Sequence, residues 1–542
     1  MSIYRKFCEE EFDESGSLVH FKIKHPDNFN FGYDVVDLIA ELEPDKTALI
    51  WCNTEGEEHI FSFRDIQVLS NKAANVFRSH GIKKGDKVMV MLKRHFEYWY
   101  TTIALHKLGA ILVPVTHMLT SDDIEYRVNS AAIKAVICTP DEDAPQKILL
   151  AQKACPSLQM LCTVKKTVDC FVNLSQEVES ASDMLERILT EASEPMVMYF
   201  TSGTTGYPKG VIHDHTYPLS HIITAKYWQQ VLDGGLHFTV AETGWAKTSW
   251  GKLYGQWLAG SAVMVFDFDN FDPKQLMTII NKYNVTSFCA PPTVYRYLVK
   301  KGIVDMPSLK HASTAGEALN PEVFNRFYER TGITLMEGYG QTESALILGN
   351  LTGSVSRPGS MGKPSPLYQV KLIKEDGAPA ESGEIGELVI VPPESGKQSG
   401  IFTGYHNNPD LYSEVWKGGV YHTGDTAWQD SDGYYWFNGR IDDVIKTCGF
   451  RVGPFEIENV LMEHPAVMEC SVVGVPDQLR GQAIKAVVVL APGFMESTHL
   501  LKDIREYCNT KVAEYKWIRY IESVTALPKT ISGKIRKIEL RA

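Results

Sequence analysis

The chain has 542 residues, of which 44% are hydrophobic and 22% are charged, and its formal net charge is −12. A chain of this length exceeds what one hydrophobic core supports, so we expect two or more domains. The composition is that of a globular protein and argues against a disordered or fibrous one. The acidic balance disfavours nucleic acid as the main partner, and an anionic ligand would need a local pocket of basic side chains and backbone N–H groups.

The cysteines and the first residues bear on the cellular compartment. Ten cysteines occur without a C-x-x-C pair, which argues against a zinc ribbon and favours reduced thiols. Residues 1–12 contain Glu9, Glu10 and Glu11 and no apolar core, so a secretory signal is excluded and a transit peptide fits poorly. No segment approaches the roughly 20 apolar residues of a membrane-spanning helix. We therefore expect a cytoplasmic protein without a membrane span.

Short apolar runs alternate with longer helical patterns over most of the chain. Residues 87–92, 111–115, 135–138 and 262–266 have the pattern of buried strands, and residues 97–108 have that of a helix. This alternation predicts an α/β fold with layered, mostly parallel sheets and helices between the strands.

The pattern changes after residue 350. Turn residues become dense, for example at residues 383–386, and short strands between them predict a small β-rich subdomain. A charged segment at residues 439–446 then precedes a second α/β unit, so we place a hinge at Asp442. We expect a large N-terminal domain at residues 1–441 hinged to a small α+β C-terminal domain at residues 442–542.

The first candidate site is the loop Thr201-Ser-Gly-Thr-Thr-Gly206 with Lys209, which follows the apolar run 196–200. Its glycines allow a tight turn in which backbone N–H groups converge on an anion, and its hydroxyls and ammonium suit phosphate oxygens. The G-x-x-x-x-G-K-S/T spacing of a Walker A loop is absent. We interpret the segment as a phosphate-binding loop, and a surface hairpin rich in Thr and Gly is the alternative.

The second candidate is the segment Glu337-Gly-Tyr-Gly-Gln-Thr-Glu343. Tyr339 stands between glycines, so its ring can lie on a flat base. Thr342 offers a hydroxyl, and Glu343 offers a hard oxygen ligand for Mg²⁺. A polar turn with a packed tyrosine is the alternative.

The third candidate pairs Asp425, at the end of the segment 421–425, with Arg440. A carboxylate can accept both hydroxyls of a ribose, and a guanidinium can reach a hydroxyl or a phosphate. By itself this is a solvated turn.

The fourth candidate is the segment 528–534, in which Gly533 gives the loop freedom to deliver Lys534 into a site. One ammonium between a carboxylate and a phosphate offsets their repulsion as they approach. A basic tail is the alternative.

These four segments, in this order, resemble the acyl-adenylate-forming superfamily, which contains acyl- and aryl-CoA synthetases, peptide-synthetase adenylation domains and luciferase. The resemblance runs from about residue 60 to Lys534. Within the superfamily the sequence is most similar to AMP-forming medium-chain acyl-CoA synthetases. The resemblance implies that ATP and a carboxylic acid give an acyl-adenylate and pyrophosphate, and that CoA then gives acyl-CoA and AMP after the C-terminal domain swings about Asp442.

The resemblance also implies the site residues. The catalytic residues would be Lys534, Thr342 and Glu343, with Glu343 holding Mg²⁺. The residues that bind ATP or AMP would be Thr201, Ser202, Gly203, Thr204, Thr205, Gly206, Lys209, Gly316, Glu317, Ala318, Glu337, Gly338, Tyr339, Gly340, Gln341, Asp425, Arg440 and Arg451. The CoA-binding residues would be Cys448, Gly449, Phe450, Arg480, Lys516 and Arg519.

Two features bear on the acid and the thiol. Acetyl-CoA synthetases have a tryptophan where this chain has Gly340, so the resemblance implies an acyl pocket that takes acids larger than acetate. Trp245 is expected to form a pocket wall, with a core aromatic as the alternative. Arg480 favours free CoA over a carrier-protein thiol, because a carrier-bound phosphopantetheine lacks the 3′-phosphate.

Several alternatives stay open at this point. An aryl-CoA ligase and an enzyme that loads a carrier protein are the nearest rivals. A nucleotide-binding regulator without catalysis is opposed by the presence of Lys534, Glu343, Arg440 and Asp425. The chain length, branching and aromaticity of the acid are open, and a homo-oligomer is possible.

Overall fold

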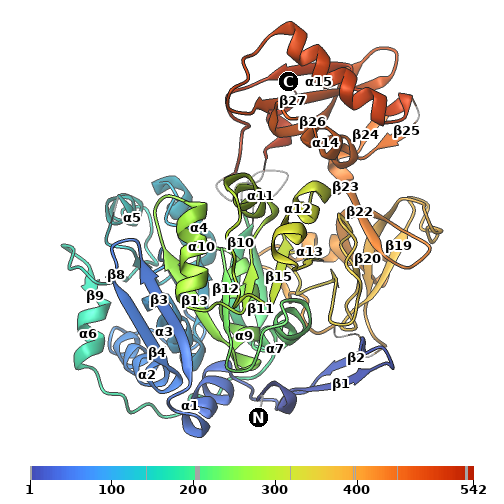
Figure 1. Ribbon diagram of the computed structural model, residues 1–542. Coiled ribbons are helices and arrows are strands. Elements are labelled where there is room, and N and C mark those ends of the chain that lie inside the picture. Colours follow the sequence, from blue (N-terminus) through green and yellow to red (C-terminus); the bar gives the residue numbers. More distant parts are fainter. Residues whose placement is uncertain are drawn as a thin grey trace.

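The computed structural model describes residues 3–541 except 142, 202–207, 318, 395, 397, 449 and 531–534. A large body holds most of the chain, and a smaller body formed by the last part of the chain stands on it (Figure 1). None of the helices in the described part of the chain is long and apolar enough to span a bilayer.

Two large sheets form the main body. The first has eight strands, in the order β21-β11-β10-β6-β5-β7-β8-β9. Their bounds are β5 Lys87–Met91, β6 Ile111–Pro114, β7 Ala135–Cys138, β8 Met160–Thr163, β9 Val172–Asn173, β10 Pro195–Thr201, β11 Lys209–Asp214 and β21 Gly404–Tyr405. Strands β10, β6, β5, β7, β8 and β9 run parallel, and β11 and β21 extend the edge antiparallel.

The second large sheet has nine strands, in the order β18-β17-β16-β15-β14-β12-β13-β3-β4. Their bounds are β3 Thr47–Asn53, β4 Glu58–Ser62, β12 Leu236–Thr239, β13 Ala262–Asp267, β14 Ser287–Cys289, β15 His311–Ala315, β16 Leu335–Tyr339, β17 Leu348–Gly349 and β18 Lys363–Pro364. The run from β16 to β3 is parallel. The prediction of an α/β fold with mostly parallel, layered sheets is confirmed.

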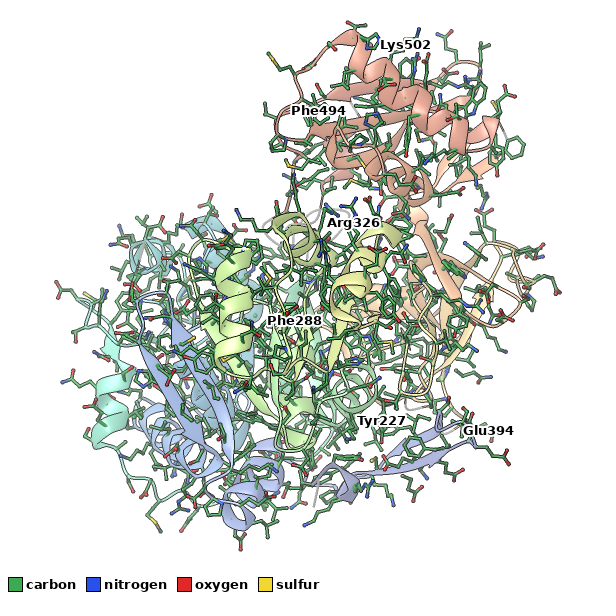
Figure 2. All side chains as sticks on the ribbon, in the orientation of Figure 1. Tyr227, Phe288, Arg326, Glu394, Phe494 and Lys502 are labelled. Atoms are coloured by element: carbon green, nitrogen blue, oxygen red, sulfur yellow. The ribbon has the colours of Figure 1, made fainter. Side chains whose placement is uncertain are left out.

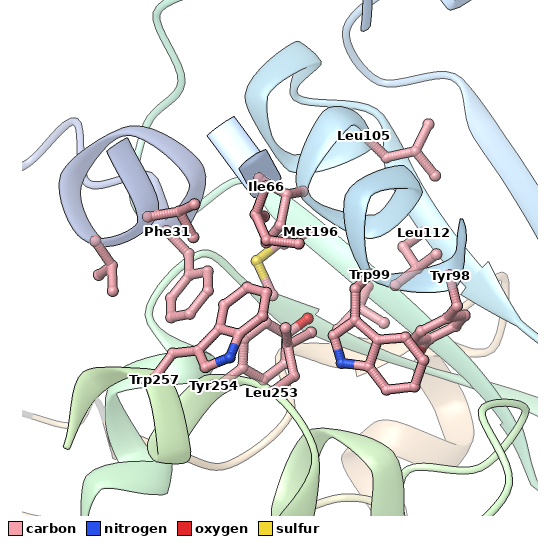
Figure 3. Close-up of a cluster of buried hydrophobic side chains, with 14 of the residues drawn as sticks. Phe31, Ile66, Tyr98, Trp99, Leu105, Leu112, Met196, Leu253, Tyr254 and Trp257 are labelled. Atoms are coloured by element: carbon pink, nitrogen blue, oxygen red, sulfur yellow. The ribbon is translucent and has the colours of Figure 1, made fainter. Parts of the chain in front are cut away.

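Helices cover and separate these sheets. Their bounds are α1 Leu38–Leu42, α2 Phe63–Ser79, α3 Glu97–Leu108, α4 Ser121–Ala131, α5 Ala144–Gln152, α6 Leu174–Ser180, α7 Tyr217–Ile222, α8 Lys247–Gly251, α9 Tyr254–Leu258, α10 Pro273–Lys282, α11 Pro292–Lys301, α12 Pro321–Thr331 and α13 Pro409–Val415. Every residue of α3 is buried, as expected for a helix inside a large core. Figure 3 shows Trp99 of α3 near Tyr254 and Trp257 of α9, and the Trp99 indole donates to the carbonyl of Lys252 at 2.7 Å.

Two smaller antiparallel sheets complete the large body. The β-rich subdomain has four strands, in the order β19-β20-β22-β23, with bounds β19 Gln369–Ile373, β20 Gly386–Val391, β22 Tyr421–Gln429 and β23 Tyr435–Arg440. Near the beginning of the chain, β1 (Cys8–Phe12) and β2 (Leu18–Ile23) form a two-stranded ribbon.

The smaller body has a sheet of five strands. Its elements are β24 Ile445–Thr447, β25 Phe450–Val452, β26 Val467–Asp477, β27 Gly481–Leu490, β28 Tyr520–Ser523, α14 Pro454–Met462 and α15 Thr498–Lys511. Asp442 lies in the short 3-10 turn Ile441–Asp443 between β23 and β24. Figure 2 places Arg326 of α12 at the side of the large body that faces the smaller one.

Candidate active site

The predicted phosphate loop joins β10 to β11. Thr201 ends β10 opposite Lys209 at the start of β11, so the loop closes an antiparallel hairpin. Ser202, Gly203, Thr204, Thr205 and Gly206 lie outside the described residues, as do Ala318, Gly449 and Lys534. The base of the loop therefore sits at the edge of the first large sheet, beside the parallel strand β6.

Lys209, Glu343 and Tyr405 form a compact polar group at this edge. The Lys209 ammonium lies 3.1 Å from a carboxylate oxygen of Glu343 and donates to the Tyr405 hydroxyl at 2.8 Å. That hydroxyl donates to Glu343 at 3.0 Å. Burial and the Glu343 charge raise the pKa of Tyr405 well above its usual value, so the phenol stays protonated. The group presents one positive and one negative charge next to the predicted phosphate loop.

His213 of β11 fixes the segment that carries Thr342. Its Nε2–H donates to the Thr342 carbonyl at 2.7 Å, and its ring stacks on Tyr217 at 3.9 Å between centroids. Burial lowers the pKa of His213 to about 4, so it is neutral at physiological pH and keeps this hydrogen bond. Nothing in the sequence pattern distinguishes His213 from the other residues of this apolar strand.

Asp425 is the centre of a second polar group. The hydroxyl of Tyr339 and the amide of Gln341 both donate to Asp425 Oδ2, at 2.5 Å and 2.7 Å. Gln341 also donates to the Thr423 carbonyl at 2.8 Å and accepts from Tyr421 at 2.9 Å. The second and third sequence candidates therefore meet in space, because β16 and β22 bring them together.

Arg440 lies directly opposite Asp425 in the β22–β23 ladder. Burial acts to lower the pKa of Arg440, but the charges of Asp425, Asp442 and Asp443 outweigh it and raise the pKa above its usual value. Gly424 has φ +71°, and a Cβ there would lie 3.3 Å from the Arg440 guanidinium. A glycine before Asp425 thus leaves room for the arginine beside the carboxylate.

Glu337 and Thr314 are buried and face each other across β16 and β15. Glu337 Oε2 and Thr314 Oγ1 have no hydrogen-bond partner among the described residues. Burial raises the pKa of Glu337 to about 8. Since buried polar atoms are normally paired, this pair offers hydrogen-bonding capacity to a ligand or to ordered water.

The predicted adenine segment begins directly after β15. Gly316 has φ +96°, and a Cβ there would lie 2.2 Å from the Lys247 ammonium. Glu317 accepts from the Thr293 hydroxyl at 2.6 Å. Lys247, which no sequence motif indicated, therefore lies against the predicted nucleotide site.

The space beside Gly340 differs from the expectation of an open pocket. A Cβ at Gly340 would lie 2.3 Å from a ring carbon of Trp250 and 2.6 Å from the Ala345 carbonyl oxygen. The buried Trp250 indole thus occupies the room that the glycine leaves. Trp245, the expected pocket wall, is half-buried at the turn before α8, and the turn of α8 carries Trp250 inward.

The predicted CoA residues gather at one end of the smaller sheet. Exposed Cys448 has φ +49°, and its sulfur accepts from the Arg480 guanidinium at 3.3 Å. Phe450 is half exposed and stacks on Tyr515 at 4.4 Å. Lys516 adjoins the Tyr515 ring.

The remaining basic candidates of the smaller body have partners of their own. Lys516 pairs with Glu456 at 2.5 Å, and the Arg519 guanidinium lies 5.6 Å from the centre of the Trp517 ring. Arg451 of β25 pairs with Glu375 of the β-rich subdomain. This pair directs the Arg451 guanidinium toward the β-rich subdomain.

The site has the features of an adenylate-forming ligase. A hairpin loop stands next to a Lys–Glu pair, and an aspartate is bonded to Tyr339 and Gln341. A second body is attached at a turn. The family model described as AMP-binding enzyme matches residues 37–406, and the model of the AMP-binding enzyme C-terminal domain matches residues 456–534. The chain belongs to the AMP-binding enzyme family.

Curated relatives and solved structures narrow the class. The human mitochondrial acyl-coenzyme A synthetase ACSM3 is 38% identical over 536 residues, covering 96% of this chain and 90% of the relative. Human ACSM4, also a mitochondrial acyl-coenzyme A synthetase, is 38% identical over 530 residues, covering 95% of this chain and 90% of the relative. The chain is an acid–thiol ligase, an AMP-forming acyl-CoA synthetase that binds ATP, as the sequence predicted.

Two solved structures resemble the whole chain. The anthranilate CoA ligase AuaEII in complex with anthranoyl-AMP has a TM-score of 0.87 and 28% identity, covering 95% of this chain and 97% of that one. The acyl-CoA synthetase of Brucella canis has a TM-score of 0.73 and 30% identity, covering 96% and 95%.

The prediction of a cytoplasmic location for this protein is wrong. The acyl-coenzyme A synthetases ACSM3, ACSM4 and ACSM5, to which this chain is similar, are named as mitochondrial proteins, which contradicts the prediction of a cytoplasmic protein. The acidity of the first residues was not a sufficient basis for that prediction.

Proposed function

We propose that this acyl-CoA synthetase activates carboxylic acids larger than acetate, with Mg²⁺ and CoA as its further requirements, in fatty acid metabolism. The observation that carries the proposal is the convergence of two polar groups. Lys209 and Glu343 meet beside the phosphate loop, and Asp425 is held by Tyr339 and Gln341. The first group suits phosphates and the second suits a ribose.

In the first half-reaction the acid attacks the α-phosphorus of ATP, and pyrophosphate leaves. The loop 201–206 and Lys209 would hold the leaving phosphates, while Thr342 would contact the α-phosphate. Glu343 fits Mg²⁺, because this ion takes one or two protein carboxylates together with phosphate oxygens; when bound, it would neutralise charge on the departing phosphates. Lys534 would lie between the acid and the α-phosphate and offset their repulsion.

In the second half-reaction the CoA thiol attacks the acyl carbonyl, and AMP leaves. The residues 1–441 and 442–542 would act as two domains that rotate about Asp442, which removes Lys534 and brings the CoA-binding loop to the site. Cys448 and Phe450 are exposed, so they are free to enter a site after such a rotation. Arg480 supplies a positive charge next to them.

The acid is proposed to be a medium-chain or short branched one. The Trp250 indole fills the room beside Gly340, so an acyl group would enter there once this indole moves, and Trp250 would then form the wall that the acyl group meets. A rotation of this indole would set the depth of the pocket.

An aryl acid is the second candidate. The Tyr217 hydroxyl and His221 Nε2 are buried and lack hydrogen-bond partners among the described residues. His221 lies 5.8 Å from Trp250 between ring centroids, so both could serve a polar ring substituent beyond that indole. The structural relative that holds anthranoyl-AMP is consistent with this candidate.

An ATP–pyrophosphate exchange assay over straight, branched and aromatic acids, followed by acyl-CoA detection without a carrier protein, tests the proposal. We expect exchange with propionate or larger acids, poor exchange with acetate, and acyl-CoA as the product. Preference for acetate over butyrate, or a requirement for a carrier protein, would contradict it.

A further inference from the structure

Strand β11 presents one face to the segment that carries Thr342 and Glu343. Side chains alternate along a strand, so Lys209, Val211 and His213 point to the same side. Lys209 pairs with Glu343 at 3.1 Å, and His213 Nε2–H donates to the Thr342 carbonyl at 2.7 Å. Val211 between them is buried in one apolar cluster with the first residue of β17. A strand of the first large sheet thus holds a turn that follows β16 of the second.

The turn 341–344 is fixed through three successive carbonyls. The carbonyls of Gln341 and Glu343 accept from backbone N–H groups, at 3.2 Å and 2.8 Å. The carbonyl of Thr342 between them accepts from the His213 ring. The outer two bonds therefore belong to the backbone, whereas the middle one comes from a side chain that a substitution can remove.

The Thr342 side chain, in contrast to its carbonyl, is open. It is half-buried, and within the described part of the chain its hydroxyl has no hydrogen-bond partner. A hydroxyl can donate to a phosphate oxygen. The residue therefore has a fixed backbone and a hydroxyl that is available to a ligand.

The His213 ring is itself held in place. It is 1% exposed, stacks on Tyr217 at 3.9 Å between centroids and meets the edge of Tyr199 at 6.2 Å. Tyr199 belongs to β10, which leads into the predicted phosphate loop. The ring therefore cannot turn away from the Thr342 carbonyl without disturbing its aromatic neighbours.

We propose that His213 is a positioning residue that aims the Thr342 hydroxyl at the α-phosphate of the bound nucleotide. The inference rests on the proposed role of Thr342 at that phosphate. His213 is assigned no contact with the nucleotide, so its effect passes through Thr342. A donor aligned in advance needs no reorientation when charge develops at the α-phosphate. Loss of this alignment is expected to slow adenylation about 10-fold.

Three variants separate the hydrogen bond from the packing. His213→Phe keeps an aromatic ring on Tyr217 but cannot donate, whereas His213→Gln places an amide nitrogen near the position of Nε2. His215→Phe is the matched control, because His215 is equally buried and neither ring nitrogen has a partner among the described residues. We expect His213→Phe to lower the rate of ATP–pyrophosphate exchange about 10-fold at saturating substrates, with the KM for the acid within ~2-fold. His213→Gln should recover part of the rate, and His215→Phe should match the wild type.

A double-variant cycle with Thr342→Ala tests whether the effect passes through the hydroxyl. Alanine keeps the carbonyl that His213 holds but leaves no hydroxyl to aim. The double variant His213→Phe/Thr342→Ala should therefore exchange pyrophosphate as fast as Thr342→Ala alone. Losses that multiply would assign His213 to packing and overturn the positioning role.

A binding measurement separates this inference from the proposed function, because it needs no turnover. AMP carries the α-phosphate and adenosine does not, so the ratio of their affinities in calorimetric titrations reports the phosphate contact. The ratio should fall about 5-fold in His213→Phe and stay unchanged in His215→Phe. If this result is obtained but the wild type exchanges pyrophosphate with no acid, the proposed function fails and the positioning role stands. An unchanged ratio in His213→Phe would overturn the role of His213.

Discussion

The proposed nucleotide site of the large body and the predicted CoA end of the smaller body are built differently. Hydrogen bonds between β16, the loop after it and β22 hold Asp425, Tyr339 and Gln341. Cys448 and Phe450 are exposed, and their contacts to Arg480 and Tyr515 lie within their own body. A site that keeps its ligand through both half-reactions can be fixed in advance, whereas residues that enter only in the second must be free to move.

Removal of the Lys534 ammonium should give the largest effect. Lys534→Ala is expected to lower ATP–pyrophosphate exchange ~100-fold or more, because a transition-state charge contact is lost. Thioester formation from supplied acyl-adenylate should survive. Both rates can be measured on one preparation, with Lys537→Ala, which removes a nearby lysine bonded to Glu458, as the control. Loss of both half-reactions to the same extent would refute the division of roles.

Asp425→Ala should weaken ATP binding by the large body. The loss of the carboxylate leaves Tyr339 and Gln341 without their shared acceptor, and the KM for ATP should rise about 10- to 100-fold. The KM for CoA should stay within ~2-fold of the wild type. Steady-state kinetics with each substrate varied in turn checks this prediction, and an unchanged KM for ATP would remove Asp425 from the nucleotide site.

Arg480→Ala should weaken CoA binding by the smaller body. The KM for CoA is expected to rise about 10-fold, since one charge contact to the nucleotide part of CoA is lost. Pyrophosphate exchange should not change. The same variant assayed with pantetheine, which lacks the 3′-phosphate, serves as the control. With that thiol, the KM of the variant should equal the KM of the wild type.

Trp250→Leu and Trp245→Leu form a matched pair that tests which tryptophan limits the acyl pocket. Shortening Trp250 should raise kcat/KM for longer acids relative to butyrate by about 3- to 10-fold. Shortening Trp245 should leave the ratio nearly unchanged. The reverse result would restore Trp245 as the pocket wall.

Glu337→Gln should act on the pH dependence of stability. The folded-state pKa of Glu337 is raised to about 8 by burial, above the usual value for an unfolded chain. The folded state therefore binds the extra proton, and stability falls as pH rises from about 4.5 to about 8, by about 1.36 kcal/mol per pH unit. Glutamine should remove that slope in denaturant titrations of the ligand-free protein. A slope equal to the wild type would assign it to another group.

Much of the fold and site could be predicted from the sequence. Apolar runs at 87–92 and 262–266 became parallel strands β5 and β13, because completely apolar short runs suit strands covered on both faces. Tyr339 and Asp425 could be named from their motifs, but their direct bond depends on how two different sheets place β16 and β22.

Other features needed the three-dimensional structure. Whether Trp245 or Trp250 faces Gly340 is decided by where α8 begins, which single-residue patterns do not fix. His213 resembles any residue of a buried strand until its bond to the Thr342 carbonyl is seen. The ion pair between Arg541 and Asp443 joins residues far apart in the sequence, and no local pattern reports it.

The most direct test of the central claim compares Lys534→Ala with Arg480→Ala in one experiment. For each variant, the rate of pyrophosphate exchange and the rate of acyl-CoA formation from supplied acyl-adenylate are measured at limiting CoA. We predict opposite defects: Lys534→Ala loses exchange and keeps thioester formation, and Arg480→Ala keeps exchange and loses thioester formation. If both variants were defective in the same half-reaction, whichever one it is, the assignment of fixed and mobile roles would be contradicted.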